Sequence, residues 1–124
     1  MSTPQQPPAG AAGHTIEEAL AAIDGATAVS FDGGEFIMTP GARSAVIRHS
    51  ISPARLLGRH NRGDWGDVSE RDRLANEDAL KNGGRIWSVY NFDGLEEGRL
   101  YIITDAADDD GKRHATTLLL PSEY

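Results

Sequence analysis

The order of two local patterns constrains the fold of this sequence most, because helix starts come first and strand-like segments follow. Thr39-Pro40 and Ser52-Pro53 each place a hydroxyl side chain directly before a proline. The hydroxyl can accept a hydrogen bond from a free helical amide, and proline at the first helical position gives up no hydrogen bond. Ser69, followed three residues later by Asp72, indicates a third start. We therefore expect three helices, beginning near residues 40, 53 and 70.

The C-terminal part of the chain has the pattern of strands. Residues 85–92 alternate, and residues 100–104 and 116–120 are dense in apolar side chains. The connections 93–98 and 106–112 are rich in Asp and Gly, as hairpin loops are. Short loops between consecutive strands imply antiparallel pairing. We predict an α+β fold with helices packed on one face of a small antiparallel sheet, whose C-terminal part is a three-stranded meander.

The N-terminal part divides into a leader and the start of the domain. Residues 1–13 carry no charge and three prolines, which predicts a disordered leader. Residues 14–124 are then one α+β domain, a length that suits a single core. Within it, Thr15 and Glu18 have capping-box spacing before an apolar helical stripe that ends near Gly25, and residues 26–31 and 35–38 suggest a hairpin around 32–34.

Composition excludes several classes of protein. The chain has no cysteine, which excludes disulfides, thiolate zinc sites and a cysteine nucleophile. It shows neither an apolar run of membrane-helix length nor a secretory signal pattern, so we expect a cytoplasmic protein without membrane contact. The net charge of -7 argues against direct binding of nucleic acid. The charge is uneven, because residues 43–73 carry seven arginines and four acidic residues, a net of +3 between two segments of -5 each. Internal pairing of these arginines with flanking acids is the simplest interpretation.

The most unusual stretch is Arg59–Asp67, with the sequence RHNRGDWGD, between the second and third expected helices. Three interpretations stay open. The loop is structural, with Trp65 in the core and Asp64 or Asp67 capping the next helix. Alternatively it is a binding site, in which a half-exposed Trp65 lies beside Arg59 and Arg62, residue types enriched at interfaces. In the third interpretation His60 is a general base oriented by Asp64 or Asp67, with Asn76 or Ser88 nearby.

Metal and cofactor sites are not expected. His60, Asp64 and Asp67 lie on one short loop without a second pair of ligands at zinc spacing. The acidic run 105–110, followed by Gly111, lacks the spacing and the closing glutamate of a calcium loop, which favours a solvated hairpin. No glycine spacing is typical of a phosphate-binding loop.

Residues 36–124 resemble a family of small proteobacterial proteins called plasmid-related proteins. The resemblance is carried by R-H-x-x-G-D-W-G-D at 59–67, by Thr39-Pro40-Gly41-Ala42, by Ser88-Val89-Tyr90 and by Leu119-Leu120-Pro121-Ser122-Glu123-Tyr124. Some members are labelled type I restriction enzyme M subunits, but this chain has no glycine-rich cofactor motif and no N-P-P-[YF] tetrad. Residues 106–112 lengthen a loop that is shorter in the family. The resemblance implies a setting on plasmids or other mobile elements and no particular activity.

Two functions follow as expectations. The first is a non-enzymatic accessory protein of a mobile element, anti-defence or regulatory, that binds a protein partner through Arg59, His60, Arg62, Asp64, Trp65 and Asp67. The second is a small hydrolase or nuclease-like enzyme centred on His60, Asp64 and Asp67. Convergence of these three side chains in a cleft would favour the enzyme, whereas a buried Trp65 and aspartates committed to internal bonds would disfavour it.

Overall fold

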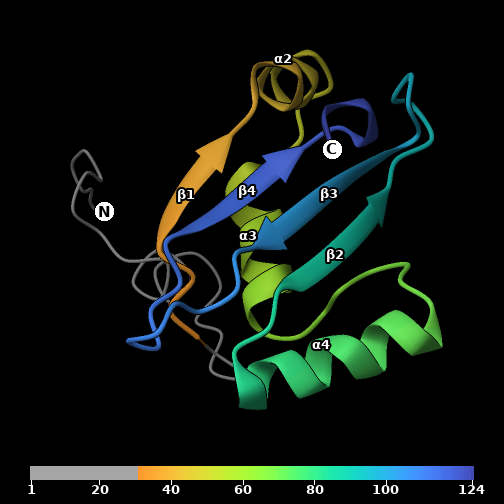
Figure 1. Cartoon of the computed structure of the whole chain (residues 1–124). Coiled ribbons are helices and arrows are strands. Elements are labelled where there is room, and N and C mark those ends of the chain that lie inside the picture. Colours follow the sequence, from red (N-terminus) through yellow and green to blue (C-terminus); the bar gives the residue numbers. More distant parts are fainter. Residues whose placement is uncertain (1–30) are drawn as a thin grey trace, which may run out of the picture.

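The computed structural model of the chain, shown in Figure 1, describes residues 31–124. The expected leader 1–13, the helix 15–25 and all but the last residue of the strand 26–31 lie outside the described residues. The elements, in chain order, are β1 Glu35–Met38, α2 Pro40–Arg48, α3 Pro53–Asn61, α4 Glu70–Asn82, β2 Ile86–Asn91, β3 Arg99–Thr104, β4 Ala115–Leu119 and a 3-10 turn, η1, Pro121–Glu123.

The three predicted helix starts are confirmed. The hydroxyl of Thr39 accepts a hydrogen bond from the amide of Ala42 at 3.2 Å at the start of α2. Ser52 caps α3 through the amide of Arg55 at 3.2 Å, and Ser69 caps α4 through the amide of Asp72 at 3.1 Å. These signals are local, because each cap acts on the turn that directly follows it.

The four strands form one sheet in the order β1-β4-β3-β2. Strands β2, β3 and β4 pair antiparallel as the predicted meander, and the α+β class is confirmed. The sheet is mixed rather than antiparallel throughout, because β1 pairs parallel with β4, with Glu35 opposite Ala115 and Met38 opposite Leu118. All three helices and two strands separate β1 from β4 in the sequence, so no tight turn imposes an antiparallel direction.

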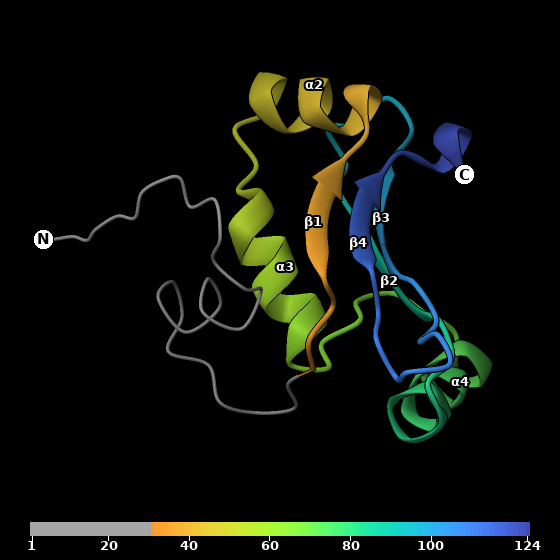
Figure 2. The same ribbon diagram turned by 60° about the vertical axis from the view of Figure 1, so that its left-hand side comes forward.

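Helices α2 and α3 lie on the same side of the sheet (Figure 2). The main core forms there, where Val46 and Leu56 pack with Tyr90, Leu100 and Leu118. Helix α4 contacts the edge strand β2 (Figure 1). A second cluster of buried residues, Trp65, Ala79 and Ile86, joins the loop before α4 to α4 and β2. Inward and outward residues alternate along β2 as predicted, with Ile86, Ser88 and Tyr90 buried.

Candidate functional site

The Arg59–Asp67 stretch begins as the end of α3. The amide of Gly63 donates to the carbonyl of His60 at 3.2 Å, and the amide of Asp64 donates to the carbonyl of Arg59 at 2.9 Å. These two bonds are the Schellman ending of a helix, which requires a left-handed residue after the cap. Gly63 supplies it with φ 88°. The first glycine of the motif therefore terminates a helix and reverses the chain toward the sheet.

The loop then pairs with the outer edge of β2. The amide of Val89 donates to the carbonyl of Trp65 at 3.0 Å, and the amide of Asp67 donates to the carbonyl of Val89 at 2.7 Å. Asn76 on α4 extends this pairing, since its amide nitrogen donates to the Trp87 carbonyl at 2.8 Å and its oxygen accepts from the Trp87 amide at 3.0 Å. An unpaired edge strand invites pairing with other chains. The loop and α4 together satisfy this edge at Trp87 and Val89.

Gly66 stands where the loop is closest to the strand. Its φ is +71°, and a Cβ atom at this position would lie 2.0 Å from the carbonyl oxygen of Val89. A side chain at position 66 would meet both backbone strain and a backbone clash. The second glycine of the motif is thus required by the pairing of loop and strand.

The charged residues of the motif are engaged mostly with one another and with the loop. Arg59 forms a two-pronged hydrogen bond with Asp64 at 2.7 and 3.2 Å, and its guanidinium lies 4.5 Å from the centre of the Tyr90 ring. The hydrogen bond from Arg59 lowers the pKa of the Asp64 carboxyl below its ordinary value. The hydroxyl of Tyr90 donates to the Asp64 carbonyl at 2.8 Å, and Asp67 accepts a hydrogen bond from Asn91.

The remaining motif residues have different environments. Trp65 is buried, with 6% of its surface exposed, and packs with Ala79 and Ile86. Arg62 is the half-buried C-cap residue of α3. Helix α4 is capped by Ser69 rather than by Asp64 or Asp67. The structural interpretation therefore had the right place for Trp65 and the wrong role for the two aspartates.

His60 is fully buried between α3 and the sheet. Its Nδ1 lies 2.6 Å from the hydroxyl of Ser88, and its Nε2 lies 2.8 Å from the hydroxyl of Thr104. Thr104 continues to the hydroxyl of Thr116 at 2.8 Å, and Thr116 donates to the carbonyl of Gly33 at 2.9 Å. We call this set of residues the His60 chain. It links α3 to β2, β3, β4 and the segment before β1.

The hydrogen-bond partners in the His60 chain determine which atom of each pair is the donor. Thr116 uses its hydrogen on the carbonyl of Gly33, so Thr104 donates to Thr116. Thr104 must then accept from Nε2–H of His60, and Nδ1 of His60 accepts from Ser88. His60 is therefore the neutral Nε2–H tautomer. Burial, reinforced by the positive charge of Arg113, lowers the pKa of His60 to about 3.

The hydrogen bonds of His60 are not those of a general base oriented by a carboxylate. The nitrogens of His60 bond hydroxyls on the sheet rather than the carboxylates of Asp64 or Asp67. Ser88 is also fully buried, so a substrate could not reach the pair of Ser88 and His60. A general base works best with a pKa near the working pH and must reach the proton that it removes. The three residues of the predicted enzyme centre thus have separate structural bonds.

Sequence reasoning named Ser88 as a neighbour of His60 but missed Thr104 and Thr116. A signal was present, because Ser88, Thr104 and Thr116 are polar residues at inward positions of strands whose other inward positions are apolar. Buried hydroxyls need partners. A row of them on adjacent strands predicts a shared polar partner, here His60 from the helix above.

The opposite face of the sheet carries a second group of residues, which we call the aromatic cluster: Arg85, Trp87, Tyr101 and Tyr124. The rings of Trp87 and Tyr124 stack with centroids 5.4 Å apart, and Tyr101 meets Trp87 edge-on at 5.2 Å. The Arg85 guanidinium lies 5.8 Å from the Trp87 ring and 5.6 Å from the Tyr124 ring. Tyr124 is 61% exposed. Helices α2 and α3 are on the other side of the sheet (Figure 2).

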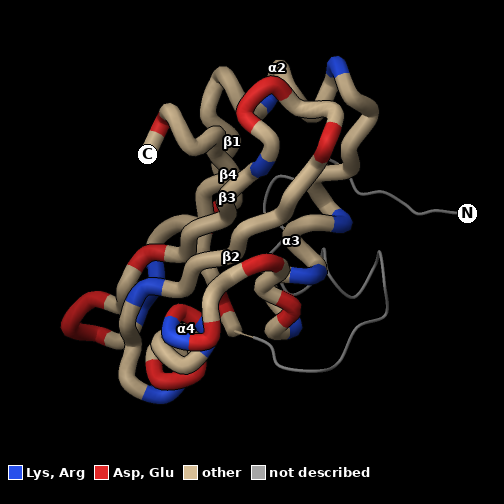
Figure 3. The backbone as a smooth tube through the Cα atoms, turned by 90° about the vertical axis from the view of Figure 1, so that its right-hand side faces the viewer, with Lys and Arg blue, Asp and Glu red and all other residues tan. Residues whose placement is uncertain are grey.

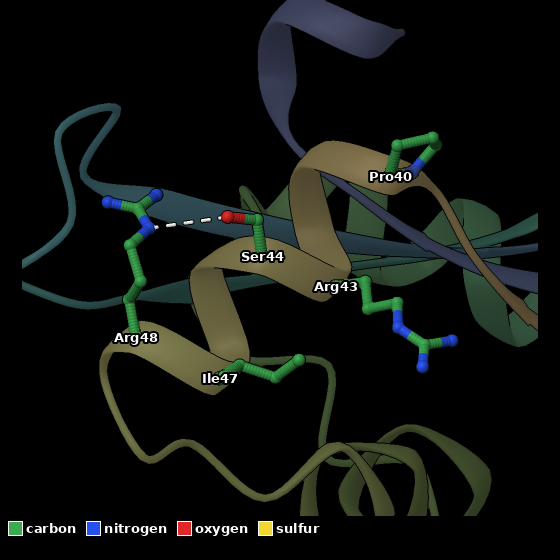
Figure 4. A pocket seen from close by; sticks show the side chains of 5 residues that line it. All are labelled: Pro40, Arg43, Ser44, Ile47 and Arg48. Atoms are coloured by element: carbon green, nitrogen blue, oxygen red, sulfur yellow. Dashed lines mark hydrogen bonds between the residues drawn. The ribbon is translucent and has the colours of Figure 1, made fainter.

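Other surface features of the described residues are weaker candidates. A hollow of about 390 Å³ is lined by Pro40, Arg43, Ser44, Ile47 and Arg48 (Figure 4). All five residues belong to α2, so the hollow is a depression on one helix and not a cleft between elements. In the acidic loop after β3, a carboxylate oxygen of Asp108 accepts hydrogen bonds from the amides of Asp110 and Lys112. Within residues 31–124, no three His, Asp or Glu side chains are placed to bind a metal ion together.

The described charges are spread unevenly over the surface. Acidic residues are frequent in the loops that join the strands, whereas α4 carries acidic and basic residues side by side (Figure 3). Arg73 pairs with Glu70 and Glu77 along α4, and Arg48 lies 3.9 Å from Glu96 in the β2–β3 loop. The expected pairing of the arginines thus occurs both within their own segment and with the C-terminal acids.

Neither a membrane-spanning helix among the described residues nor a similar known protein indicates a function for this chain. None of the helices that the structure describes is long and apolar enough to cross a membrane. Comparison with protein-family models, curated proteins and solved structures finds no match to this chain.

Proposed function

We propose that the protein is a small non-enzymatic accessory protein of a plasmid or other mobile element that binds a protein partner. The resemblance of residues 36–124 to plasmid-related proteins supports the setting. The aromatic cluster supports binding, and it is the observation that carries the proposal. Tryptophan, tyrosine and arginine are the residue types that dominate binding energy at protein interfaces. Here they gather on a sheet face opposite α2 and α3.

The aromatic cluster is a better contact surface than the Arg59–Asp67 loop. In that loop Trp65 is buried, Arg59 and Asp64 bond each other, and the backbone pairs with β2. A partner that bound there would have to compete with these internal bonds. The aromatic cluster needs no such rearrangement, because Tyr124 and Arg85 are already exposed.

The charge of the protein indicates the chemistry of the partner. Acidic residues are frequent in the loops that join β2 to β3 and β3 to β4 (Figure 3), and the whole chain has a net charge of -7. A partner surface with an apolar centre and a basic rim would complement both features. Proteins that bind nucleic acid have such basic surfaces.

No observation favours the hydrolase or nuclease-like alternative. His60 is fully buried with a pKa of about 3, and both aspartates are bonded elsewhere. We therefore propose the Arg59–Asp67 loop as the support of the β2 edge and not as a catalytic centre.

The test compares capture by matched variants of the full chain. The double variant Arg85→Ala/Tyr124→Ala removes the exposed half of the aromatic cluster, Arg62→Ala probes the loop, and Ile47→Ala, at a 67% exposed position on α2, is the control. A host protein that wild type, Arg62→Ala and Ile47→Ala retain and the double variant loses is then purified and titrated. We expect its affinity to fall at least about tenfold in the double variant.

Three outcomes would contradict the proposal. Equal affinity of the double variant and wild type would exclude the aromatic cluster as the contact. Loss of binding with Arg62→Ala alone would return the contact to the loop. Turnover of a nucleic acid or nucleotide that disappears in His60→Gln would support an enzyme. Equal melting temperatures of the variants are required for each comparison.

A further inference from the structure

A hollow of about 380 Å³ lies between three segments of the chain. Its lining comes from residues 49–52 in the turn between α2 and α3, from Arg55, Leu56 and Arg59 on α3, and from Phe92 after β2. Unlike the depression on α2, it is bounded by several elements, and its volume falls in the range of small-molecule sites, which begins at about 300 Å³. We call it the α2–α3 pocket.

The apolar lining of the α2–α3 pocket is the outer surface of the main core. Leu56 is a buried member of that core, and the half-buried Ile51 and Phe92 pack against it. The amide of Ile51 donates to the carbonyl of Val46 at 2.9 Å, which fixes Ile51 to the end of α2. The amide of Phe92 donates to the carbonyl of Gly98, also at 2.9 Å. The pocket therefore offers an ordered surface for the apolar part of a ligand.

The charged lining of the α2–α3 pocket is basic. Arg55 and Arg59 are one helical turn apart, so they lie on the same side of α3, and His49 is the C-cap residue of α2. None of the described lining residues is acidic. Arg59 donates to Asp64 through Nε and Nη2, whereas its Nη1 makes no hydrogen bond within residues 31–124. Guanidinium groups match the geometry of carboxylate oxygens, so this lining suits an anionic group.

Ser50, at the edge of the pocket, has a backbone conformation that favours glycine. Its amide donates to the carbonyl of Ile47 at 3.4 Å, and the next amide donates to the carbonyl of Val46, which together form the Schellman ending of α2. The φ of Ser50 is 54°, and every other described residue with positive φ is a glycine. A side chain in this conformation is strained, and such strain gathers at functional positions. The hydroxyl of Ser50 therefore indicates a role in this pocket.

We propose that the α2–α3 pocket binds a small aromatic carboxylate. The ring lies on the apolar lining, and the carboxylate accepts hydrogen bonds from Arg55, from Nη1 of Arg59 and from the hydroxyl of Ser50. A single negative charge fits best, because Asp64 already neutralises part of the charge of Arg59. Helices α2 and α3 lie on the side of the sheet opposite the aromatic cluster (Figure 2), so this site goes beyond the proposed partner contact and does not depend on it.

The test titrates the isotopically labelled full chain with three probes and follows the amide chemical shifts by NMR. The first probe, 2-naphthoate, has both ring and carboxylate, whereas 2-naphthalenemethanol has the ring alone and acetate has the charge alone. We expect 2-naphthoate to bind with a Kd of about 1 mM or lower, as is usual for a ligand of its size, and to shift the amides of residues 49–56 and Phe92. The other two probes should bind at least about tenfold more weakly.

Matched variants assign the site to named residues. Arg55→Gln removes a charge from the pocket and should weaken binding of 2-naphthoate at least about fivefold. Arg43→Gln removes a charge from an exposed position of α2 outside the pocket and should leave binding unchanged. Ser50→Gly should weaken binding and raise the midpoint of urea denaturation, because it removes a ligand contact and relieves the backbone strain. A residue that served the fold alone would not shift these two readouts in opposite directions.

The double variant Arg85→Ala/Tyr124→Ala controls for stacking of the probe on the aromatic cluster, and it should bind 2-naphthoate as wild type does. Loss of binding in this variant would assign the probe to the aromatic cluster and overturn the proposal. Equal affinities of 2-naphthoate and 2-naphthalenemethanol would overturn it as well, and this comparison needs no variant, so it holds even where Arg55→Gln fails to fold. Equal affinities of folded Arg55→Gln and wild type would also overturn it.

Discussion

Nε2 of His60 donates to the hydroxyl of Thr104 across 2.8 Å, which joins helix α3 to the central strand β3 through a fully buried pair. The bond lies in the middle of the His60 chain, where the hydroxyls of Thr104 and Thr116 each donate once and accept once. A neutral histidine fits this chain, whereas an imidazolium would add a second donor at Nδ1 and a buried charge. The His60 chain therefore makes the stability of the fold sensitive to protonation.

We predict that stability falls as the pH falls from about 6.5 to about 3. The ordinary pKa of histidine is 6.5, and burial lowers the pKa of His60 to about 3 in the folded protein. In this window the unfolded chain binds a proton at His60 that the folded chain does not bind. Unfolding is then favoured by up to about 1.4 kcal/mol per pH unit, and above pH 6.5 the effect is absent.

Urea denaturation at half-unit pH steps measures this slope. His60→Gln keeps a polar side chain that cannot titrate, so its free energy of unfolding should depend less steeply on pH than that of wild type between pH 6.5 and 4. Parallel curves for the two proteins would mean that His60 is protonated in the folded state as readily as in the unfolded state.

The helices could be predicted from the sequence because their signals are local. Thr39, Ser52 and Ser69 each act within three residues of their position, so no knowledge of the tertiary fold is needed. The same holds for the β2 alternation, whose period is visible in the sequence. Strand β1 is different, since its partner β4 is about eighty residues away and only the assembled sheet fixes the parallel direction.

The role of the Arg59–Asp67 motif could be predicted only in part from its local sequence. Two glycines around Asp64-Trp65 correctly indicated unusual backbone, and Gly63 and Gly66 both have positive φ. Nothing near the motif indicates that the backbone of Trp65 and Asp67 pairs with Val89, which is more than twenty residues away. Charged side chains in a loop suggest a binding or catalytic site in the sequence. In the structure, Arg59 and Asp64 instead form an ion pair with each other.

Gly66→Ala should destabilise the protein more than Gly98→Ala. Both glycines have positive φ, at +71° and +79°, so both variants incur backbone strain of about 1–2 kcal/mol. Only at Gly66 would the new Cβ meet the Val89 carbonyl, whereas nothing lies within 4 Å of it at Gly98. Disruption of the two loop–strand hydrogen bonds adds about 2 kcal/mol. Equal denaturation midpoints for the two variants would contradict the pairing of loop and strand.

Asn76→Ala should be more destabilising than Asn82→Ala on the same helix. Asn76 is 2% exposed and bonds both the amide and the carbonyl of Trp87. Its removal leaves two backbone groups at the β2 edge without partners, at a cost of about 2–4 kcal/mol. Asn82 is exposed, and its removal should change stability by less than about 0.5 kcal/mol. Hydrogen exchange at the Trp87 amide should accelerate only in Asn76→Ala, and unchanged exchange there would exclude the bridge.

Trp65→Ala separates the structural and binding interpretations of the motif. The side chain is 6% exposed and packs against Ala79 and Ile86, so its truncation should cost about 3–5 kcal/mol of unfolding free energy. Ile47→Ala, at a 67% exposed position, should change it by less than about 0.5 kcal/mol. Thermal and urea denaturation measure both. A loss below about 1 kcal/mol for Trp65→Ala, with partner capture abolished, would show that Trp65 serves binding and would return the contact surface to the loop. A large loss of stability would instead mean that any change in binding by this variant reflects unfolding, which is why the capture experiment relies on Arg85 and Tyr124.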